Sequence, residues 1–354
     1  MPATELPHPT TVRIPVGRLR ADYINVTVDR SPDARWRFRL NLHRSTRIAP
    51  GGDVRPDPFQ SLALFQRPDP LADLEVFGLD LPVEVDPADW LDLWIERHGL
   101  TPVSSKPTPT DAGVFGDVVC KWSTPEGEFA GRFATVRFAN RLFLLAMRAP
   151  RANYVALADD FFVALASFKP LESDPDGATA ERRTVVEFDN PMRAAASVPA
   201  SYAMELSLAE PGQVSAFTGD QQALASMPDD PSFGKLTILL ADLSQADHPG
   251  KAAGLYLGPL LQNPVTLHGD EFVELEGAPA PLLQAWQIVA DATLAPPGAD
   301  AVRCELRCMI LAHERGWLVA GVLGPARHDA PIAWARNKRA LDIVTSSVRF
   351  AGNG

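Results

Sequence analysis

The pattern of hydrophobic and polar positions is most regular between residues 127 and 171, where it predicts two strands and then a helix. Residues 127–138 and 141–149 read as strands, and the dipeptide between them is short enough for a tight hairpin turn. Residues 154–168 then place large apolar side chains at helical spacing, which predicts a helix lying across the sheet. We expect this unit to form the core of one domain.

A similar unit returns near the C-terminus. The pattern predicts strands at 301–313 and 315–323 and a helix within 332–350. Each unit ends with an aromatic residue just beyond its helix, Phe168 in the first and Phe350 in the second. Within the strands before these helices, we expect Trp317 to correspond to Phe143. We therefore predict an α+β protein with two tandem copies of a curved antiparallel sheet, each with helices packed on one face.

A polar stretch separates the two predicted copies. It has no apolar period and contains a Pro-Asp-Gly turn, so residues 173–183 read as a linker. The first domain is then expected at 1–172 and the second at 184–354. Two domains also fit the length, because a single core rarely grows beyond about 250–300 residues.

The remaining segments supply further strands and two more helices. Asp86 is placed to cap a helix, Pro87 to occupy its first position and Gly99 to end it. Residues 12–18 and 22–28 are expected to form a pair of strands. Further strands are predicted at 35–42, 61–67, 74–81, 114–122, 184–189, 201–208, 235–243, 265–275 and 283–293, and a helix at 250–261.

The charge balance narrows the classes of partner. With 33 basic and 44 acidic residues the net charge is −11, which disfavours nucleic acid and anionic membrane surfaces because both require clustered cations. No apolar run is long enough for a membrane span. The N-terminal residues lack the basic and apolar regions of a signal peptide, and three cysteines are too few for a disulfide framework. We therefore expect a cytoplasmic protein.

The sequence motifs do not support a metal site or a catalytic site. Cys304 and Cys308 lie on a predicted strand, where four residues separate their side chains by about 13 Å. Zinc–sulfur bonds of about 2.3 Å cannot span that gap, so both cysteines are expected in the core. No phosphate-binding glycine loop or nucleophile elbow occurs. We expect no metal, no cofactor and no catalytic residue. The alternative is an enzyme with a pocket between the domains, around His98, His268 or His313.

One face of each predicted meander mixes arginine with apolar side chains. Met, aromatics and Arg together are typical of protein-binding surfaces. The alternative is that this face packs against other parts of its own domain or on the sister domain. The predicted partner-binding residues are Arg132, Val136 and Phe138 in the first copy, and Arg307, Met309 and Leu311 in the second.

The closing segments carry a resemblance to a known family. Residues 154–171 resemble the closing helix of PsbP-like proteins, which runs into a Ser-Phe pair, and residues 339–350 look like a degraded version. Residues 185–206 are similar to the opening strand-loop-strand of that family. The family includes photosystem subunits, Ran-binding factors, DcrB-type proteins and Eag-type chaperones of type VI secretion effectors.

The resemblance implies a non-enzymatic chaperone or adaptor. Such a protein would bind an apolar segment of a protein partner, and a bacterial type VI secretion effector is the partner that the Eag-type relatives suggest. A structural subunit of a bacterial protein assembly is the other non-enzymatic hypothesis.

Overall fold

The fold is α+β, as predicted. The structure, a computed structural model, describes residues 6–29, 33–49, 60–81, 83–110, 113–171, 180–206, 212–218, 234–262, 265–276, 282–295 and 300–350. Most of the predicted linker at 173–183 therefore lies outside the described residues. The chain divides into two compact units: unit 1 comprises Met1–Pro82 and Asp86–Ala180, and unit 2 comprises Val83–Val85 and Glu181–Gly354.

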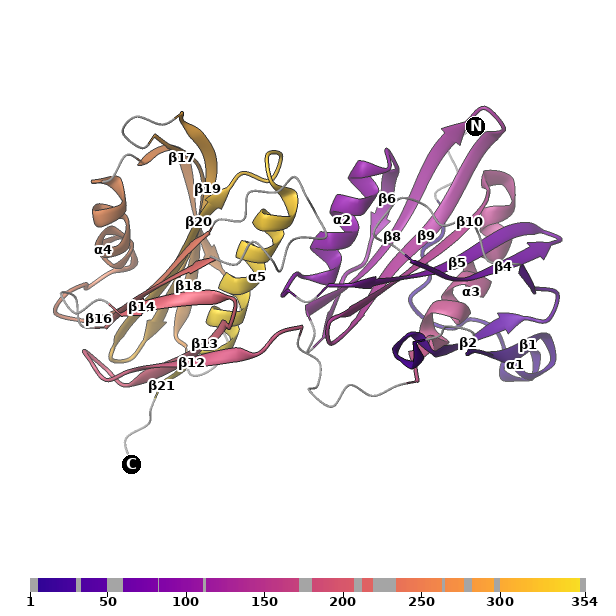
Figure 1. Cartoon of the computed structure of the whole chain (residues 1–354), viewed down its shortest axis with the longest axis horizontal. Coiled ribbons are helices and arrows are strands. Elements are labelled where there is room, and N and C mark those ends of the chain that lie inside the picture. Colours follow the sequence, from indigo (N-terminus) through magenta and orange to yellow (C-terminus); the bar gives the residue numbers. More distant parts are fainter. Residues whose placement is uncertain are drawn as a thin grey trace. The chain divides into compact units, whose positions relative to one another are not determined.

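Unit 1 contains a large and a small antiparallel sheet (Figure 1). The large sheet has the order β3 (Arg47–Ala49), β4 (Gln60–Pro68), β5 (Leu71–Asp80), β10 (Arg141–Pro150), β9 (Gly127–Phe138), β8 (Gly113–Thr124) and β6 (Thr101–Ser105), and β7 (Thr108–Thr110) also pairs with β8. The small sheet has the order β1 (Tyr23–Val28), β2 (Phe38–His43) and β11 (Lys169–Pro170). The helices are α1 (Val16–Asp22), the short 3-10 helix η1 (Ala34–Trp36), α2 (Pro87–Arg97) and α3 (Arg151–Ser167).

Unit 2 repeats this strand order. Its large sheet runs β14 (Tyr202–Leu206), β15 (Gln213–Thr218), β16 (Lys235–Asp242), β20 (Gly316–Pro325), β19 (Val302–His313), β18 (Gln284–Leu294) and β17 (Val265–Leu275). Its small sheet runs β12 (Arg183–Phe188), β13 (Ala194–Pro199) and β21 (Arg349–Phe350). The helices are α4 (Pro249–Leu261) and α5 (Pro331–Ser347).

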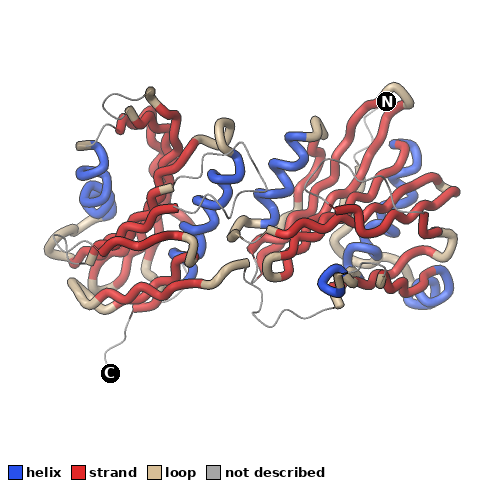
Figure 2. Tube along the Cα trace, viewed as in Figure 1, coloured by secondary structure: helices blue, strands red, loops and turns tan. Residues whose placement is uncertain are grey.

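In each unit the large sheet carries helices on both faces (Figure 2). On β9, Thr135 donates a hydrogen bond to the backbone of α2, while the neighbouring Ala134 belongs to the core beneath α3. Because successive residues of a strand point to opposite faces, α2 and α3 cover opposite sides. In unit 2, Ile310 packs in the core with α4 and Leu311 in the core with α5. The prediction that helices cover one face of each sheet is therefore incomplete, because a helix also covers the other face.

The predicted helix start at Asp86-Pro87 is confirmed. The Asp86 carboxylate accepts hydrogen bonds from the backbone N–H groups of Ala88 and Val114, so it caps α2 and fixes the start of β8. Pro87 is the first helical residue. Gly99, just beyond the helix, has a φ of +64°, a left-handed conformation that favours glycine.

Each closing helix ends in a serine that ties it to the small sheet. The hydroxyl of Ser167 accepts a hydrogen bond from the N–H of Asn41 on β2, at 2.8 Å. In unit 2 the hydroxyl of Ser347 accepts the same bond from Ser197 on β13, also at 2.8 Å. The predicted terminal aromatics are therefore not equivalent, because Phe168 directly follows its serine and Phe350 comes three residues after its own.

Two further sequence-based expectations are wrong. Residues 12–18 do not pair with 22–28, because α1 begins at Val16 and β1 pairs with β2 instead. The hairpin turns also show that Trp317 corresponds to Leu142 rather than to the neighbouring Phe143, since each is the second residue of its strand. A shift of one residue along a strand moves each side chain to the opposite face of the sheet. Trp317 accordingly packs on the face that α4 covers.

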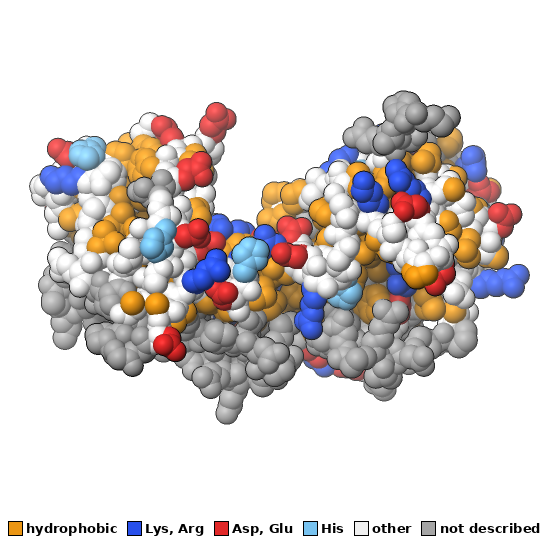
Figure 3. Space-filling view, turned by 90° about the horizontal axis from the view of Figure 1, so that it is seen from above, with side chains coloured by type: hydrophobic (Ala, Val, Ile, Leu, Met, Phe, Trp, Pro, Cys, Tyr) orange, Lys and Arg blue, Asp and Glu red, His pale blue; other side chains and the backbone are white. Residues whose placement is uncertain are grey.

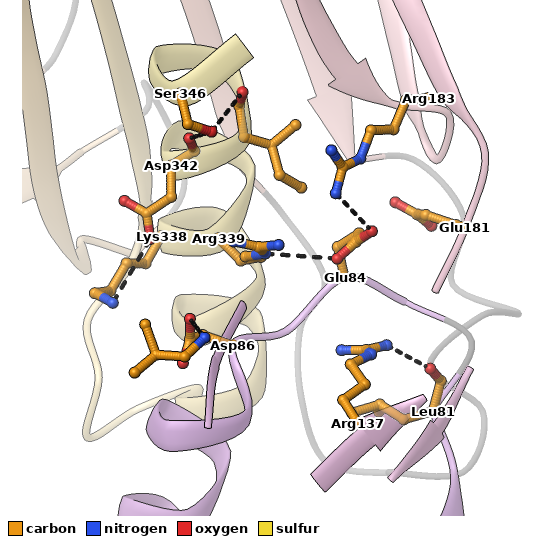
Figure 4. Close-up of polar contacts among 12 residues, drawn as sticks. Leu81, Glu84, Asp86, Arg137, Glu181, Arg183, Lys338, Arg339, Asp342 and Ser346 are labelled. Carbon is orange, nitrogen blue, oxygen red and sulfur yellow. Dashed lines mark hydrogen bonds and ion pairs between the residues drawn. The ribbon is translucent and has the colours of Figure 1, made fainter. Parts of the chain in front are cut away.

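A short segment that follows β5 in the sequence belongs to unit 2. Its Glu84 is 1% exposed and lies between two guanidinium groups (Figure 4). Oε1 is 3.4 Å from Nη2 of Arg183, and Oε2 is 3.5 Å from Nε of Arg339 on α5. The predicted domain boundaries did not place residues 83–85 in unit 2, because no local pattern in this segment indicates it.

Candidate functional site: an open sheet edge in unit 2

The partner-binding face predicted in unit 1 lies beneath α3. We expected Arg132 to contact a partner, but the residue is fully buried and not accessible to one. Its guanidinium carbon lies 5.1 Å from the ring centre of Phe162 on α3. Val136 and Phe138 are partly buried and pack against the core that α3 closes. Of the two alternatives for this face, packing within its own domain is the one observed.

Arg132 is held in a buried polar network. Its Nε and Nη2 donate to the two carboxylate oxygens of Asp117 at 2.9 and 2.6 Å. Nε2 of His8 lies 3.1 Å from Asp117, and Nδ1 lies 2.9 Å from the hydroxyl of Ser104. Burial raises the pKa of Asp117, but the hydrogen bonds and charges of His8 and Arg132 outweigh it and hold the pKa below its usual value.

Ser104, His8 and Asp117 stand in the order of a nucleophile, a base and an orienting acid. Both carboxylate oxygens of Asp117 also accept hydrogen bonds from Arg132, so the carboxylate is shared between the imidazole and a buried guanidinium. The backbone carbonyl of His8 also accepts a hydrogen bond from Lys106 at 2.6 Å. These contacts fasten the N-terminal segment to unit 1, and sequence reasoning missed them because His8 lies far from its partners along the chain.

The corresponding face of unit 2 lies beneath α5. Arg307 stacks on Trp334 with 5.1 Å between the guanidinium carbon and the ring centre, and it forms an ion pair with Glu305. Leu311 is buried and Met309 partly buried in the core with α5, so Leu311 does not form an exposed contact surface. Arg307, whose side chain is 19% exposed, lines a small surface depression with Glu305 and Trp334.

The candidate metal and catalytic residues take part in local contacts. Cys304 and Cys308 are buried core residues on β19, as predicted, and burial raises both thiol pKa values. His98 stacks on Trp94, His268 lies 2.8 Å from the hydroxyl of Thr293, and His313 stacks on Phe350. Within the described parts of the chain, no group of three or more His, Cys, Asp or Glu side chains could hold a metal ion.

The open surface lies instead at one edge of the large sheet of unit 2. Strand β17 is last in the strand order, and among the described residues its pairing partner is β18. All four residues at positions 271–274, which we name the edge segment, are exposed. Phe272 is 45% exposed and Val273 is 41% exposed. Two neighbouring apolar side chains on opposite faces of one strand are therefore both in contact with water.

The register shows how the edge segment is arranged. Phe272 lies opposite Ile288, and Glu274 lies opposite Trp286, on the face that α4 covers. Val273 and Glu271 project from the other face, since side chains alternate along a strand. Each face of the edge segment thus presents one apolar side chain and one carboxylate. Figure 3 shows hydrophobic side chains lying among acidic ones on the surface of unit 2.

The matching edge of unit 1 is built differently. Strand β6 has five residues where β17 has eleven, and it carries a proline, Pro102. Its register with β8 shifts between Pro102 and Ser104, which marks a bulge. Short length, proline and bulges are the features by which natural sheets prevent pairing at an edge. The edge of unit 1 is protected in this way. Strand β17 of unit 2 has a bulge of its own between His268 and Glu271, but beyond that bulge it exposes Phe272 and Val273.

The sequence predicted β17 but not its exposure. The letters EFVE place two apolar residues side by side between glutamates, which departs from the alternation of a half-buried strand. That departure is the feature in the sequence that could have indicated an edge strand. No described helix is long and apolar enough to cross a membrane.

Comparisons with known proteins give likenesses among solved structures. No protein-family model matches the chain, and no curated protein matches it. The chain is similar to the PsbP protein CyanoP of Synechocystis, with 9% identity and a TM-score of 0.33 over 43% of this chain and 94% of that one. It is also similar to the Ran-binding protein Mog1p of Saccharomyces cerevisiae, with 11% identity and a TM-score of 0.31 over 48% of this chain and 96% of that one.

A third likeness extends over both units. The type VI secretion immunity protein TplEi of Pseudomonas aeruginosa is 12% identical, with a TM-score of 0.21 over 93% of this chain and 97% of that one. These similarities include a PsbP protein, the family that the closing helices resemble. They do not single out a DcrB- or Eag-type relative.

Proposed function

We propose that the protein is a non-enzymatic adaptor or chaperone that holds a segment of a protein partner at the open edge of unit 2. One observation carries the proposal: Phe272 and Val273 are exposed side by side on a strand whose outer edge has no partner among the described strands. An exposed apolar edge strand is a template for pairing with another chain. A protein keeps such an edge at the risk of aggregation, and a binding role accounts for its presence.

The polar residues support a non-enzymatic role. The buried ions Asp117 and Arg132 neutralise each other, and Arg307 is engaged by Glu305 and Trp334. These contacts stabilise the fold. The finer form of the proposal, an effector of a type VI secretion system as the partner, comes from the resemblance to Eag-type chaperones.

The proposal is tested by copurification with matched edge variants. The tagged protein is isolated from its native cells as wild type, as the double variant Phe272→Thr, Val273→Thr, and as the control Val103→Thr on β6 of unit 1. We expect a partner in stoichiometric amount with the wild type and the control, and its loss from the double variant. Val103 is 39% exposed, so the control removes a comparable apolar side chain from the protected edge.

A partner retained equally by all three proteins would place the interface elsewhere and contradict the proposal. A copurifying protein that is an effector before its secretion would identify a chaperone. One that remains with the chain in a finished assembly would identify a structural subunit.

A further inference from the structure

The kind of segment that the edge accepts follows from its geometry, if the proposed binding role holds. We infer that the partner contributes an extended strand to the large sheet of unit 2, and that opposite residues 271–274 this strand reads cationic, apolar, apolar, cationic. The occupant is thus a β-forming segment of another protein with two basic residues flanking two hydrophobic ones. The inference combines the outer edge of β17, which pairs with no other described strand, with the order of its side chains.

The backbone provides the affinity. Alternate residues of an edge strand direct their N–H and C=O groups away from the sheet, and an added strand pairs with them as in other cases of strand addition. The pairing of β17 with β18 shifts between His268 and Glu271, and Gly269 within that shift has a φ of +76°. This bulge interrupts the edge, so a regular added strand is confined to the part that begins at Glu271.

The side chains provide the specificity. Residues directly opposite each other on paired strands share a face, and opposite charges or apolar pairs stabilise the contact. A basic residue opposite Glu271 and another opposite Glu274 would each face one carboxylate. Apolar residues opposite Phe272 and Val273 would cover the exposed side chains. Because this order reads the same in both directions, it suits a parallel or an antiparallel strand.

A second copy of this chain does not satisfy these requirements. Two edge segments paired in antiparallel register would place Glu271 of one copy opposite Glu274 of the other, and like charges directly opposed are destabilising. The apolar pair alone would match. The carboxylates therefore act against self-association and select a cationic partner, in keeping with the use of charge to protect edge strands.

The inference is tested with synthetic peptides by fluorescence anisotropy on the full chain. The probe is a labelled Thr-Lys-Val-Ile-Lys-Thr amide, and its charge-reversed form carries Glu in place of both Lys. We expect the cationic peptide to bind about tenfold more tightly, because two cross-strand pairs change from attractive to repulsive. The protein variant Glu271→Lys, Glu274→Lys should reverse this order of the two peptides. A reversal by compensating charges also excludes a non-specific attraction to the acidic protein.

Backbone methylation separates strand addition from side-chain contact. Two peptides are made, one methylated at the backbone nitrogens of the odd-numbered residues and the other at those of the even-numbered residues. Only one of these two methylation phases removes the N–H donors that face β17. We expect one of the two peptides to bind about tenfold or more weakly, because it loses several hydrogen bonds to β17, and the other to bind about as well as the unmethylated peptide. Circular dichroism of the variants confirms that they fold.

The outcomes distinguish this inference from the proposed function. If the copurified partner depends on Phe272 and Val273 while both methylation phases bind alike, the binding role stands and strand addition is wrong. Equal binding of the cationic and charge-reversed peptides overturns the predicted sequence order. If the chain forms dimers that the double variant Phe272→Thr, Val273→Thr dissolves, the occupant is a second copy and the inference fails.

Discussion

The two units share one strand order but finish their large sheets differently. Strand β6 of unit 1 is short and interrupted by a bulge at Pro102, whereas β17 of unit 2 is long and exposes Phe272 and Val273. The shared topology shows that the fold does not require a long edge strand with exposed apolar side chains, because unit 1 ends the same sheet with the short strand β6. The exposed apolar pair of unit 2 is therefore not a consequence of the architecture, and the proposed binding role accounts for it.

A second difference concerns an arginine that lies beneath the closing helix of each unit. Arg132 and Arg307 both stack under an aromatic side chain of that helix, with 5.1 Å between guanidinium carbon and ring centre in each case. In unit 1 a carboxylate on the neighbouring strand β8 and a histidine of the N-terminal segment enclose the arginine. In unit 2 the carboxylate is Glu305, on the same strand, and the pair stays partly exposed.

The largest expected effect comes from removing the enclosed arginine. Arg132→Met leaves the Asp117 carboxylate buried without its main partner, and breaking such a pair destabilises by about 3–5 kcal/mol. The matched change Arg307→Met should cost about 1 kcal/mol or less, because that ion pair is partly exposed. Denaturant unfolding gives the free energies, and hydrogen exchange in β9 and β19 assigns the loss to a unit. Equal losses would contradict the distinction between the enclosed and the open arginine.

The next effect tests whether residues 83–85 stabilise unit 2. Glu84→Gln removes the carboxylate between Arg183 and Arg339, and we expect a loss of about 2 kcal/mol because Arg339 remains buried while Arg183 reaches solvent. The loss should be seen as faster hydrogen exchange in α5 and β12, both in unit 2. The control Glu187→Gln changes an exposed carboxylate on β12 and should have little effect. Faster exchange confined to unit 1 would show that residues 83–85 do not stabilise unit 2.

Much of the fold could be predicted because its features are local. The hairpins, the α2 cap at Asp86 and the placement of Cys304 and Cys308 in a core all follow from patterns within about a dozen residues. The expected correspondence between the units failed by one residue at Trp317, because low similarity leaves the alignment of two strands undetermined until the hairpin turns are seen.

The candidate site could not be predicted in the same way. The pattern around Arg132 and Arg307 places arginine and apolar side chains on one face of a strand, but it could not reveal that α3 and α5 cover that face. The exposure of Phe272 depends on β17 being last in the strand order, which is a property of the whole sheet. The contact between His8 and Asp117 likewise joins residues that are distant along the chain.

A smaller and equal effect is expected at the serines that end the closing helices. Ser167→Ala and Ser347→Ala each remove the acceptor for a backbone N–H of the small sheet, and each should cost about 1 kcal/mol. Restoring the hydroxyl as threonine should recover part of the loss. The free energies of unfolding again provide the measurement. A marked inequality would mean that the two closing helices are not fastened by the same device.

The smallest expected effect on stability is at the edge itself. Phe272→Thr should change the free energy of unfolding by less than about 0.5 kcal/mol, because the side chain is 45% exposed and threonine is favourable in strands. A substitution to threonine at Phe133, which is 1% exposed on β9, should instead cost about 3 kcal/mol or more because it leaves a cavity. Thermal unfolding of both variants measures the contrast. If Phe272→Thr destabilises unit 2 substantially, the phenylalanine serves the fold, and its exposure no longer argues that the edge is kept open for a partner.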